Sequence, residues 1–231
     1  MKSIAGRLSR ITEITFVPHI VTDPLLFRRS VPARFFVNAI KSFLRGLFKV
    51  CFRLDVFGRE KIPTSGPFLI CPNHLSDIDP LLLYSLLPED TLYIAYERNF
   101  RHAPLSWIIR YGRVLLTTRG GKTPRCLIRA YQGLQQGFSV CLFPEGGRTT
   151  SGSLLEPRDG AAILSKQANI PILPVFIEGS ENLLSPVRPG FRFCKIKIAF
   201  GDPIEPAAAD PAELLQNWKR AIVQLQQEVN S

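Results

Sequence analysis

From about residue 55 onward, short apolar runs alternate with stretches of helical periodicity. The apolar runs have the length and the Val, Ile, Leu and Phe content of buried strands. They fall at 68–71, 93–95, 114–117, 139–143, 172–177 and 195–200. The helical stretches fall at 80–87, 104–111, 122–136, 159–169 and 211–229. Alternation of this kind predicts an α/β sheet with helices on its faces.

The first 54 residues follow a different pattern. A short helix is expected at 3–17, and prolines then break the chain into turns. Residues 32–54 have the periodicity of a longer helix, with a wide face rich in Phe and Leu. A basic residue recurs there every fourth position, which predicts a single basic stripe opposite the apolar face. The residues of this stripe are Lys41, Arg45, Lys49 and Arg53.

The net charge of +10 is concentrated in the same part of the chain. Residues 1–60 hold eleven of the 29 Lys and Arg residues, against four of the 19 Asp and Glu residues. A basic segment suits nucleic acid or anionic lipid. The wide apolar face of 32–54 favours an anionic bilayer over nucleic acid, with a core-packed helix as the alternative. We therefore expect a membrane-associating unit at 1–54 and an α/β domain at 55–231.

Three features bear on the compartment. No uncharged apolar run approaches the roughly 18 residues that span a bilayer. Charged residues from Lys2 onward interrupt any signal-peptide core. The five cysteines have no zinc-type spacing and are expected to be free thiols in a reducing compartment. Together they predict a peripheral or monotopic protein on the cytoplasmic face of a membrane.

Two polar loops directly follow expected strands, which is where ligands bind in α/β sheets. The first loop contains His74 and Asp79, a pair that suits a general base with an orienting carboxylate. Five residues on a regular helix would set them about 140° apart. They can therefore pair only across a loop-to-helix junction, where Pro80 favours Asp79 as the N-cap.

Other interpretations of this first loop remain open. Asp77 is a competing partner for the histidine. The loop can also be a plain turn with a satisfied histidine. A metal site is a third interpretation, but one histidine and two aspartates without a second histidine are weak evidence for one.

The second loop, 143–149, follows the expected strand at 139–143. Gly146 and Gly147 free the backbone to turn and to offer N–H groups to an anion. Arg148 adds a fork of donors that suits phosphate. Glu145 is expected to hold this arginine or an acceptor hydroxyl, and a tight surface turn is the alternative.

Taken together, these residues resemble the glycerolipid acyltransferases, the family that contains bacterial 1-acylglycerol-3-phosphate acyltransferase. Asn73, His74 and Asp79 resemble the family's NHx4D motif, and residues 143–148 resemble its FPEGTR motif. Arg119 resembles the arginine that closes its second motif. The segment Ile172-Leu173-Pro174-Val175 resembles its late proline block, and the match runs from about residue 55 to 206.

The resemblance implies a mixed sheet flanked by helices and an O-acyltransferase that needs no metal or cofactor. His74, held by Asp79, would deprotonate the hydroxyl of 1-acyl-sn-glycerol 3-phosphate. That oxygen would attack the thioester of acyl-CoA or acyl carrier protein, forming phosphatidic acid for phospholipid biosynthesis. The resemblance implies that the acceptor is held by Asn73, Arg119, Glu145, Gly146, Gly147 and Arg148.

Two departures from the family pattern bear on the acceptor. Gly147 stands where threonine is usual, and Arg113 stands where the second motif usually begins with glycine. The extra cation suggests a differently placed or larger anionic head group. Other acceptors are glycerol 3-phosphate, a lyso-ornithine lipid or another lysophospholipid. Two further alternatives are a non-catalytic lipid-binding membrane protein and a hydrolase that uses water.

Overall fold

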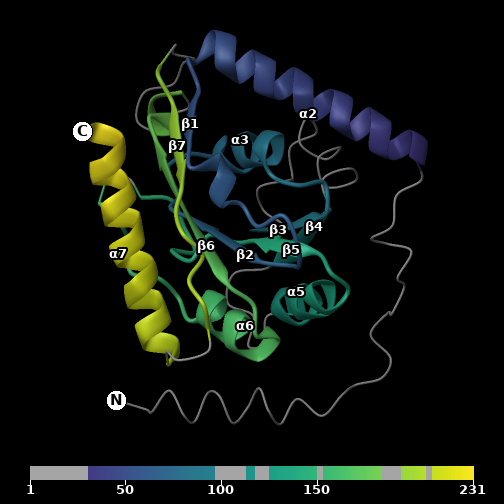
Figure 1. Cartoon of the computed structure of the whole chain (residues 1–231), viewed down its shortest axis with the longest axis vertical. Helices are drawn as coiled ribbons and strands as arrows, with labels where there is room; N and C mark the ends of the chain where they lie inside the picture. The colour runs from purple at the N-terminus through teal and green to yellow at the C-terminus, as the bar shows by residue number, and fades with distance from the viewer. Residues whose placement is uncertain (1–30, 97–112, 118–124, 150–152, 184–193, 207–209) are drawn as a thin grey trace.

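The computed structural model describes residues 31–96, 113–117, 125–149, 153–183, 194–206 and 210–231 (Figure 1). Within these residues seven strands form one sheet in the order β1-β7-β6-β2-β5-β3-β4. The strands are β1 (Asp55–Phe57), β2 (Leu69–Pro72), β3 (Thr91–Tyr96), β4 (Val114–Thr117), β5 (Ser139–Cys141), β6 (Ile172–Glu178) and β7 (Lys197–Phe200). All six strands expected from the apolar runs are present, and β1 is one that the pattern did not predict.

The sheet is mixed, as expected. Strands β6, β2, β5, β3 and β4 are parallel to their neighbours within that group. Strand β7 runs antiparallel to β6, and β1 pairs in parallel with β7. The carboxyl ends of the five parallel strands therefore meet at one edge, where ligands bind in such sheets.

Helices cover both faces of this sheet (Figure 1). Helices α2 (Val31–Cys51) and α3 (Asp79–Leu86) pack on one face. Helices α5 (Arg125–Gln135), α6 (Gly160–Ala168) and α7 (Pro211–Asn230) pack on the other. The expected helices at 3–17 and 104–111 lie outside the described residues.

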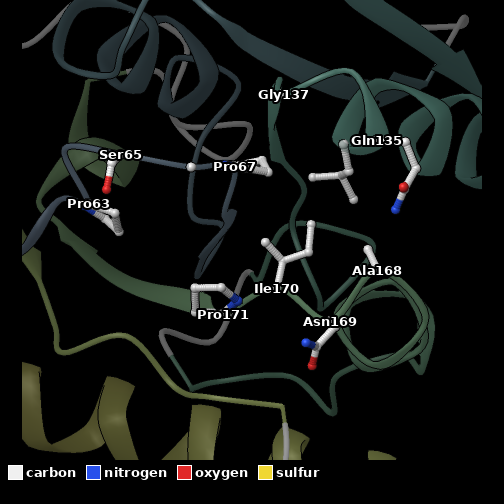
Figure 2. A pocket seen from close by; sticks show the side chains of 11 residues that line it. Pro63, Ser65, Pro67, Gln135, Gly137, Ala168, Asn169, Ile170 and Pro171 are labelled. Carbon is white, nitrogen blue, oxygen red and sulfur yellow. The ribbon is translucent and has the colours of Figure 1, made fainter.

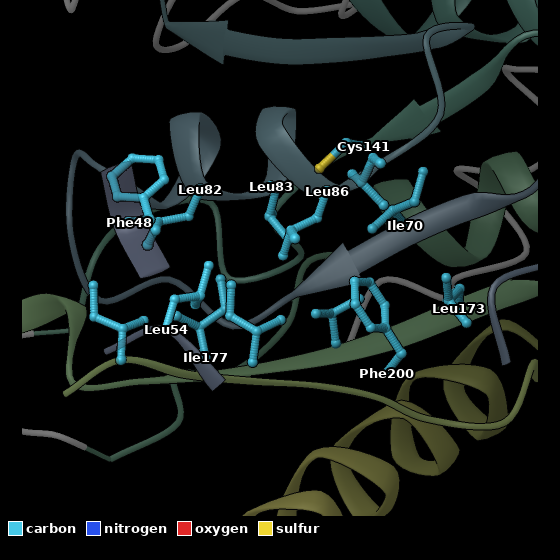
Figure 3. Close-up of a cluster of buried hydrophobic side chains, with 14 of the residues drawn as sticks. Phe48, Leu54, Ile70, Leu82, Leu83, Leu86, Cys141, Leu173, Ile177 and Phe200 are labelled. Carbon is cyan, nitrogen blue, oxygen red and sulfur yellow. The ribbon is translucent and has the colours of Figure 1, made fainter. Parts of the chain in front are cut away.

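Alternating side chains of the strands fill the two cores. On β6, Leu173 and Ile177 belong to the cluster beneath α2 and α3, which Figure 3 shows with Phe48 of α2 and Leu83 of α3. Phe176 points to the opposite face, into the cluster with α5, α6 and α7. Burial on both faces explains why these strands read as continuous apolar runs instead of an alternating pattern.

The first and last residues of the predicted basic stripe, Lys41 and Arg53, do not lie on an exposed face of helix α2. Lys41 is only 6% exposed and packs against α3. Its Nζ donates a hydrogen bond to the carbonyl oxygen of Leu87 at 2.6 Å and lies 5.0 Å from the centre of the Tyr84 ring. Arg53 lies beyond the end of the helix, with φ +43°. A four-residue repeat drifts by about 40° per step on a helix of 3.6 residues per turn. That drift carries Lys41 round to the side that packs on α3.

A second apolar surface on α2 faces away from the core. Phe36, Phe43, Leu47 and Val50 are 59%, 69%, 40% and 81% exposed. Their spacings of seven, four and three place them on one side of the helix. We call these four residues the α2 apolar stripe. In the part of the chain that the structure describes, no helix is long and apolar enough to cross a bilayer.

Candidate active site

The loop between β2 and α3 brings His74 and Asp79 together. Nδ1 of His74 lies 2.9 Å from Oδ2 of Asp79. The same oxygen accepts the backbone N–H groups of Leu75 and Ser76, each at 2.8 Å. The Asp79 side chain is fully buried, so these donors replace water as its partners. The carboxylate therefore fixes both the loop and the imidazole.

The predicted helix cap is wrong by one residue. Helix α3 begins at Asp79, the N-cap position is Ile78, and no side chain caps the helix. Pro80 consequently occupies the second helical position. Asp79 closes the preceding loop instead of capping, because its Oδ2 is taken up by His74 and the two loop N–H groups.

The ring of His74 is held in one orientation with one nitrogen left over. It stacks on Phe143, with ring centres 4.0 Å apart and planes at 29°. The carboxylate of Asp79 requires a proton on Nδ1, so the neutral ring carries its lone pair on Nε2. No described residue hydrogen bonds to Nε2, and the side chain is 13% exposed. This nitrogen is placed to take a proton from a substrate hydroxyl.

Glu145 connects the two polar loops through backbone hydrogen bonds. Its Oε1 accepts the N–H of His74 at 2.9 Å, and its Oε2 accepts the N–H of Leu155 at 2.8 Å. Thr149 N–H completes the clamp by donating to the carbonyl oxygen of His74 at 3.0 Å. Burial raises the pKa of Glu145, and the two N–H donors partly oppose that rise. Both carboxylate oxygens thus already hold backbone groups, where the sequence suggested Arg148 or a substrate hydroxyl.

Asn73 fixes the end of β2 against β6. Its side-chain amide donates to the carbonyl oxygen of Ile177 at 3.0 Å and accepts the N–H of the same residue at 2.7 Å. From the other face, Nε1 of Trp218 donates to the carbonyl oxygen of Cys71 at 2.7 Å. These bonds hold the strand that leads directly into His74.

The glycines of the second loop have different surroundings. Gly146 has φ +64°, and a Cβ added there would lie 2.5 Å from Nε of Arg158. The positive φ strains any side chain at this position, and a Cβ there would also require the Arg158 side chain to move. A Cβ on Gly147 would meet nothing within 4 Å. Packing among the described residues therefore does not exclude the threonine that is usual in the family at that position.

Comparison with known proteins identifies a family whose sequence pattern includes both polar loops. A family model described as "Acyltransferase" matches residues 53–178, more than half of the chain. The chain belongs to this acyltransferase family. The match includes both polar loops and strands β1 to β6.

Curated relatives of this acyltransferase are similar over part of their length. It is 27% identical over 176 residues to human 1-acyl-sn-glycerol-3-phosphate acyltransferase beta, covering 74% of this chain and 63% of that protein. It is 29% identical over 137 residues to the alpha form from Mus musculus, covering 58% and 48%. It is 30% identical over 141 residues to a glycerol-3-phosphate acyltransferase from Alteromonas mediterranea, covering 54% and 17%. The chain therefore spans less than two thirds of each of these proteins.

A solved structure has the same fold. The crystal structure of the 1-acyl-sn-glycerophosphate (LPA) acyltransferase PlsC from Thermotoga maritima aligns with a TM-score of 0.76 and 22% identity. The alignment covers 98% of this chain and 88% of that one. At this identity the likeness establishes the shared mixed α/β architecture.

Of the two cations predicted to hold the acceptor, Arg148 and Arg119, the structure describes only Arg148. Arg148 lies at the site, and its Nη1 donates to Oδ2 of Asp77 at 2.6 Å. Asp77 is therefore the partner of Arg148, not of His74. Arg119 lies outside the described residues, so its predicted role stays a prediction. Arg158, which packs on Gly146, is a cation that the sequence analysis missed, because it stands in a segment with neither helical nor strand periodicity.

Arg113 does not extend the anion site, contrary to the expectation from the sequence. It precedes β4 at the amino-terminal edge of the parallel strands, where its backbone carbonyl oxygen accepts the N–H of Tyr93. Its Nη1 donates to Oδ1 of Asp90 at 2.8 Å, and its guanidinium lies 4.9 Å from the ring centre of Phe138. The residue is structural, because it pairs and stacks at the edge opposite His74.

A hollow of about 480 Å³ opens at that same opposite edge (Figure 2). The segment that leads into β2 and the carboxyl-terminal ends of α5 and α6 line it, with Pro67, Gly137 and Asn169 among the residues. No lining residue has an ionisable side chain. The hollow therefore offers no acid or base for the chemistry.

Neither the cysteine thiols nor the potential metal-binding side chains of the described residues form a second candidate site. Burial raises the pKa of Cys71 and of Cys141, which keeps both thiols protonated and unreactive. Among the described residues, all five cysteines are free and no group of three side chains is arranged to hold a metal ion.

Proposed function

We propose that this acyltransferase moves a fatty acyl group from acyl-CoA or acyl carrier protein to the free hydroxyl of 1-acyl-sn-glycerol 3-phosphate, forming phosphatidic acid. The observation that carries the proposal is the 2.9 Å contact between Nδ1 of His74 and Oδ2 of Asp79. It leaves Nε2 as the basic nitrogen, and a binding protein would have no use for such a base. The names of the human and mouse relatives support lysophosphatidate as the acceptor.

The proposed reaction is an acyl substitution in two stages, addition to the thioester carbonyl and elimination of the thiol. Nε2 of His74 removes the proton from the acceptor hydroxyl as its oxygen attacks the thioester carbonyl carbon. The new C–O bond forms, the tetrahedral intermediate collapses and the C–S bond breaks. The imidazolium, which Asp79 stabilises, then returns the proton to the leaving thiolate. The products are an ester and a free thiol, and no external reductant or metal takes part.

We assign the phosphate of the acceptor to the second loop. Arg148 supplies guanidinium donors, and the backbone of Gly146 and Gly147 turns beside it. Arg158 packs on Gly146 and adds a second positive charge. Glycerol 3-phosphate is the second candidate acceptor, favoured by the similarity to the enzyme from Alteromonas mediterranea, because it presents the same phosphate.

We also propose that helix α2 docks the enzyme on the cytoplasmic face of an anionic membrane. The α2 apolar stripe (Phe36, Phe43, Leu47 and Val50) is exposed on the side of the helix away from the core. Exposed Lys49 lies on the same helix and suits the anionic head groups. The bilayer would then supply the lysolipid and receive the product.

A thiol-release assay with palmitoyl-CoA tests the reaction class and the acceptor together. The purified chain is assayed with and without lysophosphatidate, and the lipid products are resolved by mass spectrometry. Thiol release that depends on lysophosphatidate and yields phosphatidate supports the proposal. Release without acceptor indicates a hydrolase, and turnover only with glycerol 3-phosphate indicates the second candidate. No release with either acceptor, from CoA or carrier-protein thioesters, contradicts transfer.

A further inference from the structure

The ion pair between Asp77 and Arg148 joins the two polar loops at the candidate site. Oδ2 of Asp77 lies 2.6 Å from Nη1 of Arg148, although the residues are 71 apart in the chain. Both side chains are accessible, with 56% and 39% of their surfaces exposed. Asp77 also lies three residues from His74, within the loop that Asp79 closes.

This contact puts an acidic group of the protein on the arginine that suits a phosphate. A carboxylate and a phosphate bind a guanidinium through the same N–H donors. A phosphate that binds Arg148 through Nη1 must therefore displace the carboxylate of Asp77. Because the pair is exposed, its free energy is small enough for a phosphate to overcome.

We infer that Asp77 is an exchangeable counter-ion that sets how tightly this site holds a phosphate-bearing head group. The inference rests on the proposed function in one respect, namely that Arg148 binds the acceptor's phosphate. Asp77 weakens the binding of the acceptor by competing for Arg148. It weakens the binding of the product equally, because esterification leaves the phosphate unchanged. By closing again on Arg148, Asp77 favours departure of the product.

The Asp77→Asn substitution removes the competing charge and keeps the side chain's size. We expect the KM for lysophosphatidate and the dissociation constant for sn-glycerol 3-phosphate to fall about two- to fivefold, the range expected for an exposed ion pair. The kcat should not rise, because tighter product binding slows release. A residue with a merely structural role would lower kcat without improving affinity.

The chain offers a matched control. Asp90 also forms an ion pair, with Arg113 at 2.8 Å, and its side chain is likewise 56% exposed, whereas the Arg113 side chain is 6% exposed. The pair lies at the amino-terminal edge of the parallel strands, opposite the site. Asp90→Asn changes the net charge by the same amount, so it corrects for any general attraction of the anion.

The deciding experiment is calorimetric titration of sn-glycerol 3-phosphate into wild type, Asp77→Asn, Asp90→Asn, Arg148→Gln and the Asp77→Asn/Arg148→Gln double variant. The inference expects tighter binding in Asp77→Asn alone, with that gain lost in the double variant. Equal affinity in Asp77→Asn and wild type, an equal gain in Asp90→Asn, or a gain that survives in the double variant overturns it. Undetectable binding in all five proteins also overturns it. Since the titration needs no turnover, its result is separate from failure of the thiol-release assay.

Discussion

Nδ1 of His74 lies 2.9 Å from Oδ2 of Asp79, and that same oxygen accepts two backbone N–H groups of the intervening loop. The carboxylate is fully buried, so its position is set by these three donors and not by water. Glu145 and Thr149 bind the N–H and the carbonyl oxygen of His74 from the second loop. The imidazole is therefore positioned before any substrate arrives, which lowers the reorganisation that proton transfer requires.

Asp79→Asn should lower kcat by about 10²- to 10⁴-fold, the range seen when the orienting partner of a catalytic histidine is altered. The amide removes the negative charge that stabilises the imidazolium. The remaining amide oxygen can still accept the three N–H groups that Oδ2 of Asp79 accepts, so the expected loss comes from the missing charge. The measurement is kcat in the thiol-release assay, with Asp90→Asn as the control for loss of one carboxylate. A variant with near wild-type kcat would remove Asp79 from its orienting role.

Glu145→Gln should change how stability depends on pH. Burial raises the pKa of Glu145 above its ordinary 4.5, so the folded state binds this proton more tightly than the unfolded state. The contribution of Glu145 to the free energy of unfolding therefore falls as pH rises from 4.5 through the folded-state pKa. Glutamine removes that slope. It also places an amide NH2 against a backbone N–H donor, at a cost of about 1–3 kcal/mol.

Urea unfolding of wild type and Glu145→Gln at a series of pH values from 4.5 upward checks this expectation. The difference in the free energy of unfolding between wild type and variant should shrink as pH rises. A difference that grows with pH, or stays constant, contradicts a raised pKa at this position.

Much of the fold follows from periodicity alone. Parallel strands buried on both faces are continuous apolar runs, and for that reason β2, β5 and β6 were located within a few residues. Strand β1 was missed because Asp55–Phe57 is three residues long and only partly buried. The role of Lys41 was also hidden. Its partner, the carbonyl oxygen of Leu87, is 46 residues away, and no local pattern reports a contact of that kind.

The site was predictable in its residue types and less so in its contacts. The spacing of His74 and Asp79 indicated a pair across a loop, and the structure has that pair. The partners of Glu145 and of Asp77 could not be inferred, because they are set by how two loops 71 residues apart meet. Side chains that bind backbone groups or one another across such a junction leave no periodic signal.

Lys41→Met should destabilise the fold without weakening membrane binding. Methionine keeps most of the apolar stem but leaves the carbonyl oxygen of Leu87 without its Nζ donor. The expected loss in the free energy of unfolding is about 1–3 kcal/mol, measured by urea denaturation. Liposome binding should be unchanged, since the residue is 6% exposed and faces α3. If a folded Lys41→Met protein binds liposomes more weakly than wild type, Lys41 contacts the membrane and this prediction is wrong.

The α2 apolar stripe should dominate membrane binding. Phe43→Ser/Leu47→Ser removes two exposed apolar side chains and should weaken binding to anionic liposomes at least about tenfold. Flotation with vesicles that contain anionic lipid measures the bound fraction. Val223→Ser on α7 is the control, because Val223 is also an exposed apolar side chain, at 47%. Equal binding by the double variant and wild type would reject α2 as the docking surface.

The most direct test of the account is the kcat of His74→Ala with palmitoyl-CoA and lysophosphatidate. Without Nε2 the hydroxyl proton loses its positioned acceptor, so we expect a loss of at least about 10²-fold. Circular dichroism, urea denaturation and liposome flotation should match wild type apart from the loss of the contacts to Asp79 and Phe143. A folded His74→Ala protein that forms phosphatidate at close to the wild-type rate would contradict the assignment of His74 as the base.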